Sequence, residues 1–346
     1  MSEKRYLTIL AACCLLLAVL CALAMAGRHS PAPEQVETAL LNSKYSLQLH
    51  RIAVAAGGRE LSLLQGTLGG RFLWWGTAPA GLGDAAAASK ELVFPVDSLT
   101  MQEFLSAMER VRSLSVVSRN QDRLSSFGLA DGEGIVVDFI LSDGSTASRI
   151  IFGDRNYSGQ RIYLRTPDSP VYQGQDQFYP WLTAAPKSWA DMALVCQQVL
   201  GISGEREVQR IVVSMAEPGG GFTQRILARG QAGAESDSGQ PQDFSSKASR
   251  LLSLRGGSLV HPDMAEGQPL LAEIVLDTGL GARATLRIHQ GNQSQSDGEV
   301  SSYYVVPRYD FMFGGGTLDS GSGTSRLSYG FEISHWTWDN LRQLMD

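Results

Sequence analysis

The pattern of apolar and polar positions divides the chain into an apolar N-terminal run and a longer, mixed remainder. Residues from Tyr6 to Ala26 include no charged side chain, and the short charged head Ser2–Arg5 precedes them. A helix needs about 20 mainly apolar residues to span a bilayer, whereas a cleaved signal peptide usually has a core of about 7–15. The pattern therefore predicts a transmembrane anchor over residues 1–27.

The orientation and processing of this anchor follow from its flanks. Lys4 and Arg5 favour a cytoplasmic N-terminus, although Arg28 beyond the span reduces the charge difference. Ala24-Met25-Ala26 also fits the small-x-small pattern of signal-peptidase cleavage. Leu10-Ala11-Ala12-Cys13 is similar to a lipoprotein box, but a strongly apolar stretch follows it. An uncleaved single-pass anchor is the leading interpretation, with cleavage and lipidation as alternatives.

Two local patterns define the first folded region. Ile135–Leu141 and Ser148–Phe152 flank Asp143-Gly144, a dipeptide that favours the tight turn of a β-hairpin. Asp97 can cap a helix, because apolar residues follow it at helical spacing. These residues are Met101, Phe104, Leu105, Met108 and Val111. Phe178–Leu182 then leads into a predicted helix over residues 188–199.

The second half repeats the order of the first. Gln209–Val213 is similar to His50–Val54, and a second helix is marked by Phe244, Ala248, Leu251 and Leu252. A second hairpin, with its turn near Thr278-Gly279, and a closing helix from Trp336 to Leu344 follow. A repeat of this length has to be recognised before the architecture is assigned.

The predicted fold class is therefore α+β. The N-terminal transmembrane helix is followed by a linker over residues 28–39 and by two tandem α+β modules over residues 40–200 and 201–346. Each module has a mainly antiparallel sheet with a helix on one face. Equivalent strands should hold Ile52 and Ile211, and equivalent helix faces should hold Phe104 and Leu251.

Composition narrows the possible partners. The chain has 346 residues, is 43% hydrophobic and carries a net charge of −6. It lacks the basic stripe of a nucleic-acid-binding protein, so no nucleic-acid partner is expected. Cys13, Cys14 and Cys21 all lie in the predicted anchor, which leaves Cys196 alone in the folded part. A lone cysteine is most often a small buried apolar residue.

No sequence motif for catalysis is evident. The five histidines are scattered, with no His-Glu-x-x-His or Cys-x-x-Cys pair to hold zinc. We therefore expect a non-enzymatic protein with no cofactor, no metal site and no catalytic residues. Clustered aromatic side chains could contact a partner or ligand, although core packing is the commoner use of such rings. The candidates are Trp74, Trp75, Trp181, Trp336 and Trp338.

Short pieces of the first module resemble, in order and spacing, the bacterial family of unknown function DUF4340. The resemblance covers residues 40–199. Its pieces are Asn42-Ser43-Lys44-Tyr45 before Arg51-Ile52, Phe94-Pro95-Val96-Asp97 before the helix, Phe127-Gly128-Leu129, the Asp143-Gly144 hairpin ending at Ile151-Phe152-Gly153, and Tyr163-Leu164-Arg165 before Val171-Tyr172.

Members of that family typically have an N-terminal membrane segment and are often encoded beside ABC transporter subunits of the gliding-motility or auxiliary type. The resemblance implies an extracytoplasmic accessory or scaffold protein of such a membrane complex, with a protein of that complex as partner. It supplies no catalytic residues, and fold-level analogy is associational. The alternative is an extracytoplasmic glycan- or peptide-binding module, and a hydrolase is the third hypothesis. The expected location is the bacterial cytoplasmic membrane, with most of the chain in the periplasm.

The orientation can be tested with protease added to spheroplasts. We expect digestion of the region after Arg28, while a tag placed before Met1 stays protected because it lies in the cytoplasm. Immunoblotting for the tag and for the folded part shows which of the two regions the protease has digested. Protection of both ends would contradict the predicted orientation.

Overall fold

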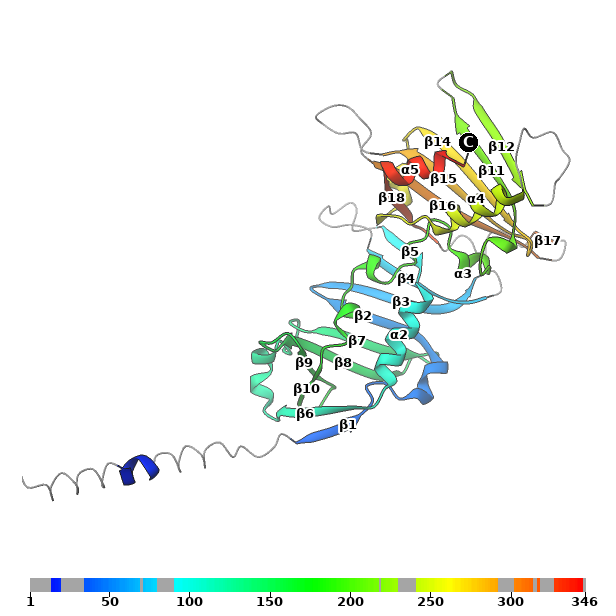
Figure 1. Cartoon of the computed structure of the whole chain (residues 1–346). Helices are drawn as coiled ribbons and strands as arrows, with labels where there is room; N and C mark the ends of the chain where they lie inside the picture. The colour runs from blue at the N-terminus through cyan, green and yellow to red at the C-terminus, as the bar shows by residue number, and fades with distance from the viewer. Residues whose placement is uncertain are drawn as a thin grey trace, which may run out of the picture.

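The computed structural model describes residues 14–19, 34–68, 71–79, 90–217, 219–229, 241–291, 302–313, 316–317 and 327–344. These residues form two antiparallel sheets joined end to end, with helices against one face of each (Figure 1). The predicted anchor lies outside the described residues except for the helical segment 14–19. Within the described ranges, no helix has the length and apolar character needed to cross a membrane.

The first sheet has ten strands in the order β1-β6-β10-β9-β8-β7-β2-β3-β4-β5. Its strands are β1 (Gln35–Thr38), β2 (Leu49–Ala56), β3 (Arg59–Leu68), β4 (Arg71–Pro79), β5 (Glu91–Pro95), β6 (Arg112–Ser118), β7 (Ile135–Leu141), β8 (Thr146–Arg155), β9 (Arg161–Arg165) and β10 (Val171–Gln175). Helix α2 (Ser98–Glu109) crosses one face of this sheet, and short 3-10 turns include η1 (Ser43–Gln48), η3 (Gln121–Phe127), η4 (Tyr179–Trp181) and η5 (Pro186–Ser188).

The second sheet has the order β12-β11-β14-β15-β16-β18-β13, with β17 beside β16. Its strands are β11 (Val208–Ala216), β12 (Phe222–Ala228), β13 (Ser258–Val260), β14 (Leu270–Thr278), β15 (Ala282–Gln290), β16 (Ser302–Phe313), β17 (Gly316–Thr317) and β18 (Gly330–Ser334). The remaining elements are α3 (Gln197–Leu200), η6 (Glu205–Glu207), α4 (Pro241–Ser253), η7 (Pro262–Ala265) and α5 (His335–Arg342).

The helix predicted after Asp97 begins at the predicted place but ends at Glu109, so Val111, predicted on its apolar stripe, lies beyond it and is 64% exposed. The Asp97 carboxylate accepts a hydrogen bond from the Thr100 amide at 2.7 Å and so caps α2. Met101, Phe104 and Met108 are buried on one side of the helix. The ring of Phe104 stacks on Phe139 of β7, with 5.9 Å between the ring centroids. This apolar stripe attaches the helix to the sheet.

The order of strands is the same in the two sheets. Removing β1, β4 and β5 leaves β6-β10-β9-β8-β7-β2-β3 in the first sheet, which corresponds strand by strand to β13-β18-β16-β15-β14-β11-β12 in the second. Helices α2 and α4 occupy the same place in the two chain orders, between the second and third shared strands. The predicted equivalence of the two halves is confirmed at the level of strand order.

The register supports this equivalence in detail. Ile52 pairs with Phe139 across β2 and β7, and Ile211 pairs with Leu276 across β11 and β14. In each ladder the register shifts just before consecutive Arg and Ile residues. The shift lies between Leu49 and Arg51 in β2, and between Val208 and Arg210 in β11. A bulge in the same place of two ladders is a specific feature rather than a consequence of composition.

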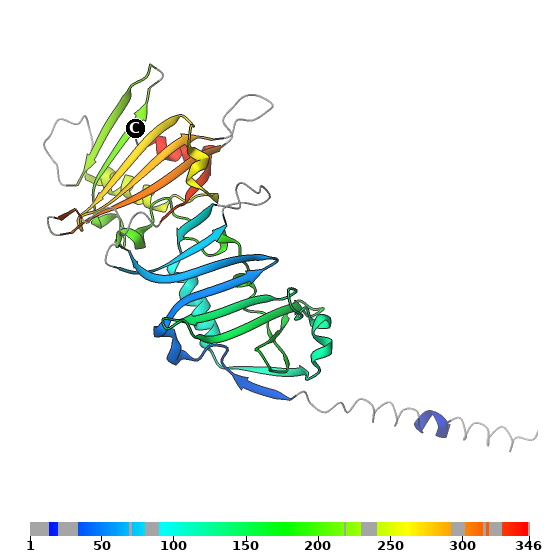
Figure 2. The ribbon, with the colours of Figure 1, turned by 180° about the vertical axis from the view of Figure 1, so that it is seen from behind.

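The faces opposite the helices face the viewer in Figure 2. Ion pairs cross neighbouring strands there, including Asp277 with Arg283 at 2.6 Å and Glu273 with Arg287 at 3.0 Å. One apolar and one polar side per strand is the alternation expected of an antiparallel sheet with one solvated face. Such exposed pairs contribute little to stability.

Two sequence predictions need correction. The helix predicted over residues 188–199 was wrong, because only Gln197–Leu200 is helical, and the chain before it is irregular and bonded to both sheets. The predicted linker ends earlier than residue 39, since Gln35–Thr38 form β1 and pair with β6.

A buried segment joins the two sheets. The Asp191 amide donates to the Pro95 carbonyl at the end of β5, and the Leu194 amide donates to the Leu254 carbonyl after α4, both at 2.9 Å. Leu194 and Cys196 are fully buried, and one continuous core extends from the first sheet to the second. The two sheets are thus a single packed body.

Truncation at this junction should destabilise both sheets together. We expect Leu194→Ala in the full-length protein in detergent to lower the free energy of unfolding by about 2–5 kcal/mol, because it leaves a cavity in the shared core. Urea unfolding followed by tryptophan fluorescence should show one transition shifted to lower urea. Leu47→Ala is the control, since Leu47 is 96% exposed. Two transitions, of which only one shifts, would contradict a shared core.

Candidate functional site

The first sheet carries a groove with a polar lining. It consists of two adjoining hollows of about 440 and 470 Å³, which share Arg110, Arg112 and Gln177 in their lining. The first hollow follows α2 past Glu103 to Trp181, and the second lies between β6 and β10. We call the whole the β6–β10 groove.

The groove exists because two neighbouring strands separate. The β6–β10 ladder ends at the pair Gln173 and Ser115, although β6 begins at Arg112 and β10 continues to Gln175. Over this stretch β6 pairs with β1 on its other side, with Arg112 opposite Thr38. One side of each strand therefore borders the hollow.

The chain after β10 also leaves this area uncovered by a helix. Pro180 and Pro186 restrict the segment to the short turns η4 and η5, since proline is not tolerated in a helix interior. In the second repeat, α5 follows the equivalent strand β18, and its Trp338 stacks on Tyr303 at 5.2 Å. In the first repeat the chain after β10 packs instead through Phe178, which is fully buried with its ring centroid 5.4 Å from that of Phe152.

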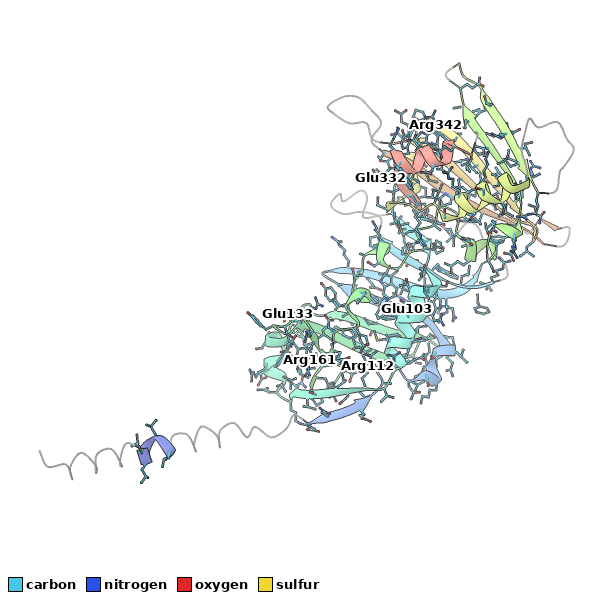
Figure 3. The ribbon with its side chains drawn as sticks, in the orientation of Figure 1. Glu103, Arg112, Glu133, Arg161, Glu332 and Arg342 are labelled. Carbon is cyan, nitrogen blue, oxygen red and sulfur yellow. The ribbon has the colours of Figure 1, made fainter. Side chains whose placement is uncertain are left out.

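Positive charge is concentrated at the β6 end of the groove. Arg110 directly follows α2. Arg112 comes from the start of β6 and Arg161 from β9 (Figure 3). Glu103 lines the other hollow, on α2. The groove is therefore cationic at one end and carries a single carboxylate towards the other.

Arg112 is the central cation of this site. Its Nη2 donates to the Ala107 carbonyl at 2.5 Å, and its guanidinium lies 4.4 Å from the centroid of the Phe178 ring. Its Nε and Nη1 atoms are buried and have no hydrogen-bond partner within the protein. Burial, followed by the nearby charge of Arg110, lowers the pKa of Arg112. Since arginine remains charged in proteins, the site holds a partly desolvated cation with unmet donors.

Glutamine amides supply the remaining polar lining. Gln35 accepts from the Ser113 hydroxyl at 3.1 Å, and Gln173 accepts from Arg161 at 3.4 Å. Gln102, Gln175 and Gln177 also line the groove. Each amide can donate and accept at once. The groove can therefore hydrogen-bond a polar chain and also neutralise a negative group on it.

The five tryptophans predicted as contacts do not form one site. Trp181 is half-buried, lines the groove and packs edge-on against Phe104. Trp74 and Trp75 line a small apolar cavity with Leu327. Trp336 is 70% exposed, whereas Trp338 is buried against Tyr303. The structure therefore brings only Trp181 to the groove.

Sequence reasoning missed the arginines and glutamines of the groove. Two signals were present: Arg110-Val111-Arg112 directly after a helix, and the alternation of Gln173, Gln175 and Gln177 in a strand and its continuation. Arg161 carried no signal, because its place beside β10 depends on strand order. Among the residues that the structure describes, no three histidine, cysteine, aspartate or glutamate side chains are grouped to hold a metal.

A buried polar cluster also occurs at the junction of the sheets. The Cys196 amide donates to the Tyr309 hydroxyl at 2.9 Å, and the hydroxyls of Tyr309 and Tyr329 lie 3.2 Å apart. Burial raises the pKa of all three side chains. A thiol in this state lacks the cationic surroundings of a reactive cysteine.

The groove lies within a recognised domain. Residues 88–256 match the model of a domain of unknown function, DUF4340. This segment of the chain belongs to the DUF4340 family. The match begins after Asn42–Tyr45 and Arg51-Ile52, two of the pieces on which the sequence resemblance rests, and extends beyond residue 199. No curated protein and no solved structure shows significant similarity to the chain.

The buried thiol gives a test of the DUF4340 fold at the junction. With Cys13, Cys14 and Cys21 changed to serine, Cys196 should resist iodoacetamide at pH 8 in the native protein and react after unfolding in urea, as mass spectrometry would show. Its native pKa lies above the ordinary value of about 8.5. The protonated Cys196 thiol therefore contributes to the free energy of unfolding below about pH 8.5. This contribution is lost as the pH rises towards the native pKa of the thiol. Rapid labelling of the native protein would contradict this burial.

Proposed function

We propose that this DUF4340 protein is a non-enzymatic accessory subunit of a membrane complex, held at the membrane by its N-terminal apolar segment, and that it binds a partner protein of that complex through the β6–β10 groove. The observation that carries the proposal is the position of the groove. Gln35 lines the groove and belongs to β1, the strand nearest in sequence to the apolar run.

Chain length limits the distance between groove and membrane. Gln35 lies nine positions after Ala26, and a chain of that length spans at most about 30 Å. The second sheet lies at the opposite end of the molecule from β1 (Figures 1 and 2). A partner in the groove would therefore be close to the membrane surface, while the second sheet reaches outward.

The family resemblance supports a proposal for the identity of the complex. An ABC transporter of the auxiliary type is the partner that it suggests, with the folded part of this chain outside the cytoplasm. The rigid junction between the sheets supports a scaffold role, because a shared core holds the second sheet at a fixed place relative to the groove.

A second candidate is an extracytoplasmic binding module for a free peptide or glycan. Trp181 favours it, since a half-buried indole in a polar groove can stack on a sugar or anchor a peptide side chain. This module would bind a free ligand in the groove without any membrane protein. The accessory subunit would bind a membrane protein there, so the identity of the bound molecule distinguishes the two functions.

Site-specific photocrosslinking in living cells can test the accessory function. A photoreactive residue in place of the exposed Gln175 should yield an adduct with a membrane-complex protein, because the groove would hold that protein. The control position is Phe222 on β12 of the second sheet, which is 56% exposed and distant from β1. Mass spectrometry identifies the adducts. The absence of any membrane-protein adduct from position 175 would contradict the proposal.

A further inference from the structure

We infer that the outer edge of β12 pairs with β12 of a second copy of this chain, so that the protein forms a two-fold symmetric dimer. The inference is independent of the β6–β10 groove, because it concerns the second sheet, at the opposite end of the molecule from β1 (Figure 1). Three observations support it: the comparison of the two repeats, the direction of the backbone groups of β12, and the side chains that β12 exposes.

The equivalent edge of the first repeat is covered by a strand. β12 corresponds to β3 in the shared strand order, and β4 pairs with β3 from Ser62 to Leu68. Among the residues that the structure describes, the second repeat has no strand equivalent to β4, so β12 ends its sheet. An edge strand presents a row of backbone groups to which a strand of another chain can add. The first repeat thus gives the model for an antiparallel strand bound at this edge.

The hydrogen bonds at the two ends of the β11–β12 hairpin show which backbone groups of β12 face outward. The Glu217 amide donates to the Gly221 carbonyl, and the Arg229 amide donates to the Gln209 carbonyl, both at 2.9 Å and in the register of the ladder. Residues of an antiparallel strand bond alternately to one side and to the other. Since Gly221 and Arg229 bond inward, every second residue between them directs its amide and carbonyl outward. These residues include Phe222, Gln224 and Ile226.

The side chains of this edge are apolar where a solitary edge strand is normally protected. Phe222 and Ile226 are 56% and 51% exposed, and they lie on the same face of β12 because they are four positions apart. Edge strands usually avoid association through proline or several charged residues. The strand Phe222–Ala228 contains no proline and one charged residue, Arg225. An unprotected edge with two exposed apolar side chains indicates an interface.

Two-fold symmetry selects the register of this interface. Symmetry about Gln224 places Phe222 of each copy opposite Ile226 of the other, and such aromatic pairs across strands are stabilising. The outward-facing backbone groups then meet one another and exchange hydrogen bonds. Symmetry about Arg225 would place like charges directly opposite each other, which is destabilising, and symmetry about Ile226 would leave Phe222 unpaired. A two-fold axis along the membrane normal keeps both N-terminal anchors in one membrane.

Disulfide formation at the two-fold axis can test this register. With the three cysteines of the N-terminal apolar run changed to serine, the full-length protein with Gln224→Cys should form a linked dimer in membranes on mild oxidation. The two Cα atoms at position 224 would lie about 5.5 Å apart, within the range that a disulfide spans. Thr223→Cys is the control, because the two positions 223 would be diagonal neighbours about 7–8 Å apart. Non-reducing gel electrophoresis measures both yields, and an equal or higher yield at position 223 would overturn the assignment.

A proline at the same position separates edge pairing from folding. The Gln224 amide faces outward, so Gln224→Pro removes a donor from the free edge and leaves the ladder with β11 in place, as edge strands tolerate. Gln224→Ala is the matched control, because it keeps the amide. Sedimentation equilibrium of the full-length protein in detergent should show a dimer whose dissociation constant rises about tenfold with proline, since both copies lose a hydrogen bond. Urea unfolding should show that the two variants are equally stable as monomers.

The remaining outcomes distinguish a second copy from other occupants of the edge. A protein that stays monomeric at all concentrations and forms no disulfide at position 224 would overturn the inference. Equal dissociation constants for Gln224→Pro and Gln224→Ala would assign dimerisation to another surface and overturn it as well. A photoreactive residue in place of Phe222 should give an adduct with a second copy, whereas an adduct with a different protein alone would mean that this protein covers the edge. The adducts at position 175 test the accessory function separately.

Discussion

The structure depends on one buried segment, the connection from Trp189 to Leu200 between the two sheets. A buried backbone is stable only when its polar groups are paired, and this segment pairs with the end of β5 on one side and with the residues after α4 on the other. Its apolar side chains at the same time complete a core shared by both sheets. The connection is therefore a structural element of both halves, and it fixes the second sheet relative to the end where the N-terminal segment arrives.

The two halves have the same strand order, and the candidate site arises where they differ. The first half adds β1 at one edge and β4 with β5 at the other, and β5 meets the second half through Val93 and Ser328. After the last shared strand, the second half continues into α5, whereas the first half has prolines and two short turns. The groove lies beside this helix-free segment, between α2, β6 and β10.

The family match reflects this repetition. Residues 88–256 begin just before β5 and end just after α4, so the matched segment runs from before one helix to the end of its equivalent. The matched segment is about as long as one repeat, but its strands belong partly to the first sheet and partly to the second. The DUF4340 segment in this chain thus cannot complete either sheet by itself. Its β11, β12 and α4 need the later strands, and its first part needs β2 and β3.

The sequence by itself determined the local elements, because each was encoded by neighbouring residues. Asp97 and the apolar spacing after it specified α2, Asp143-Gly144 specified the hairpin of β7 and β8, and the recurring order specified the repeat. Tertiary structure decided whatever depended on residues far apart in the chain. The segment before Gln197 is not helical because it pairs with the end of β5 and with the residues after α4. The groove joins Gln35, Arg112 and Arg161 only through strand order. Local periodicity carries no information about which strands separate, so the site could not be found before the sheet was known.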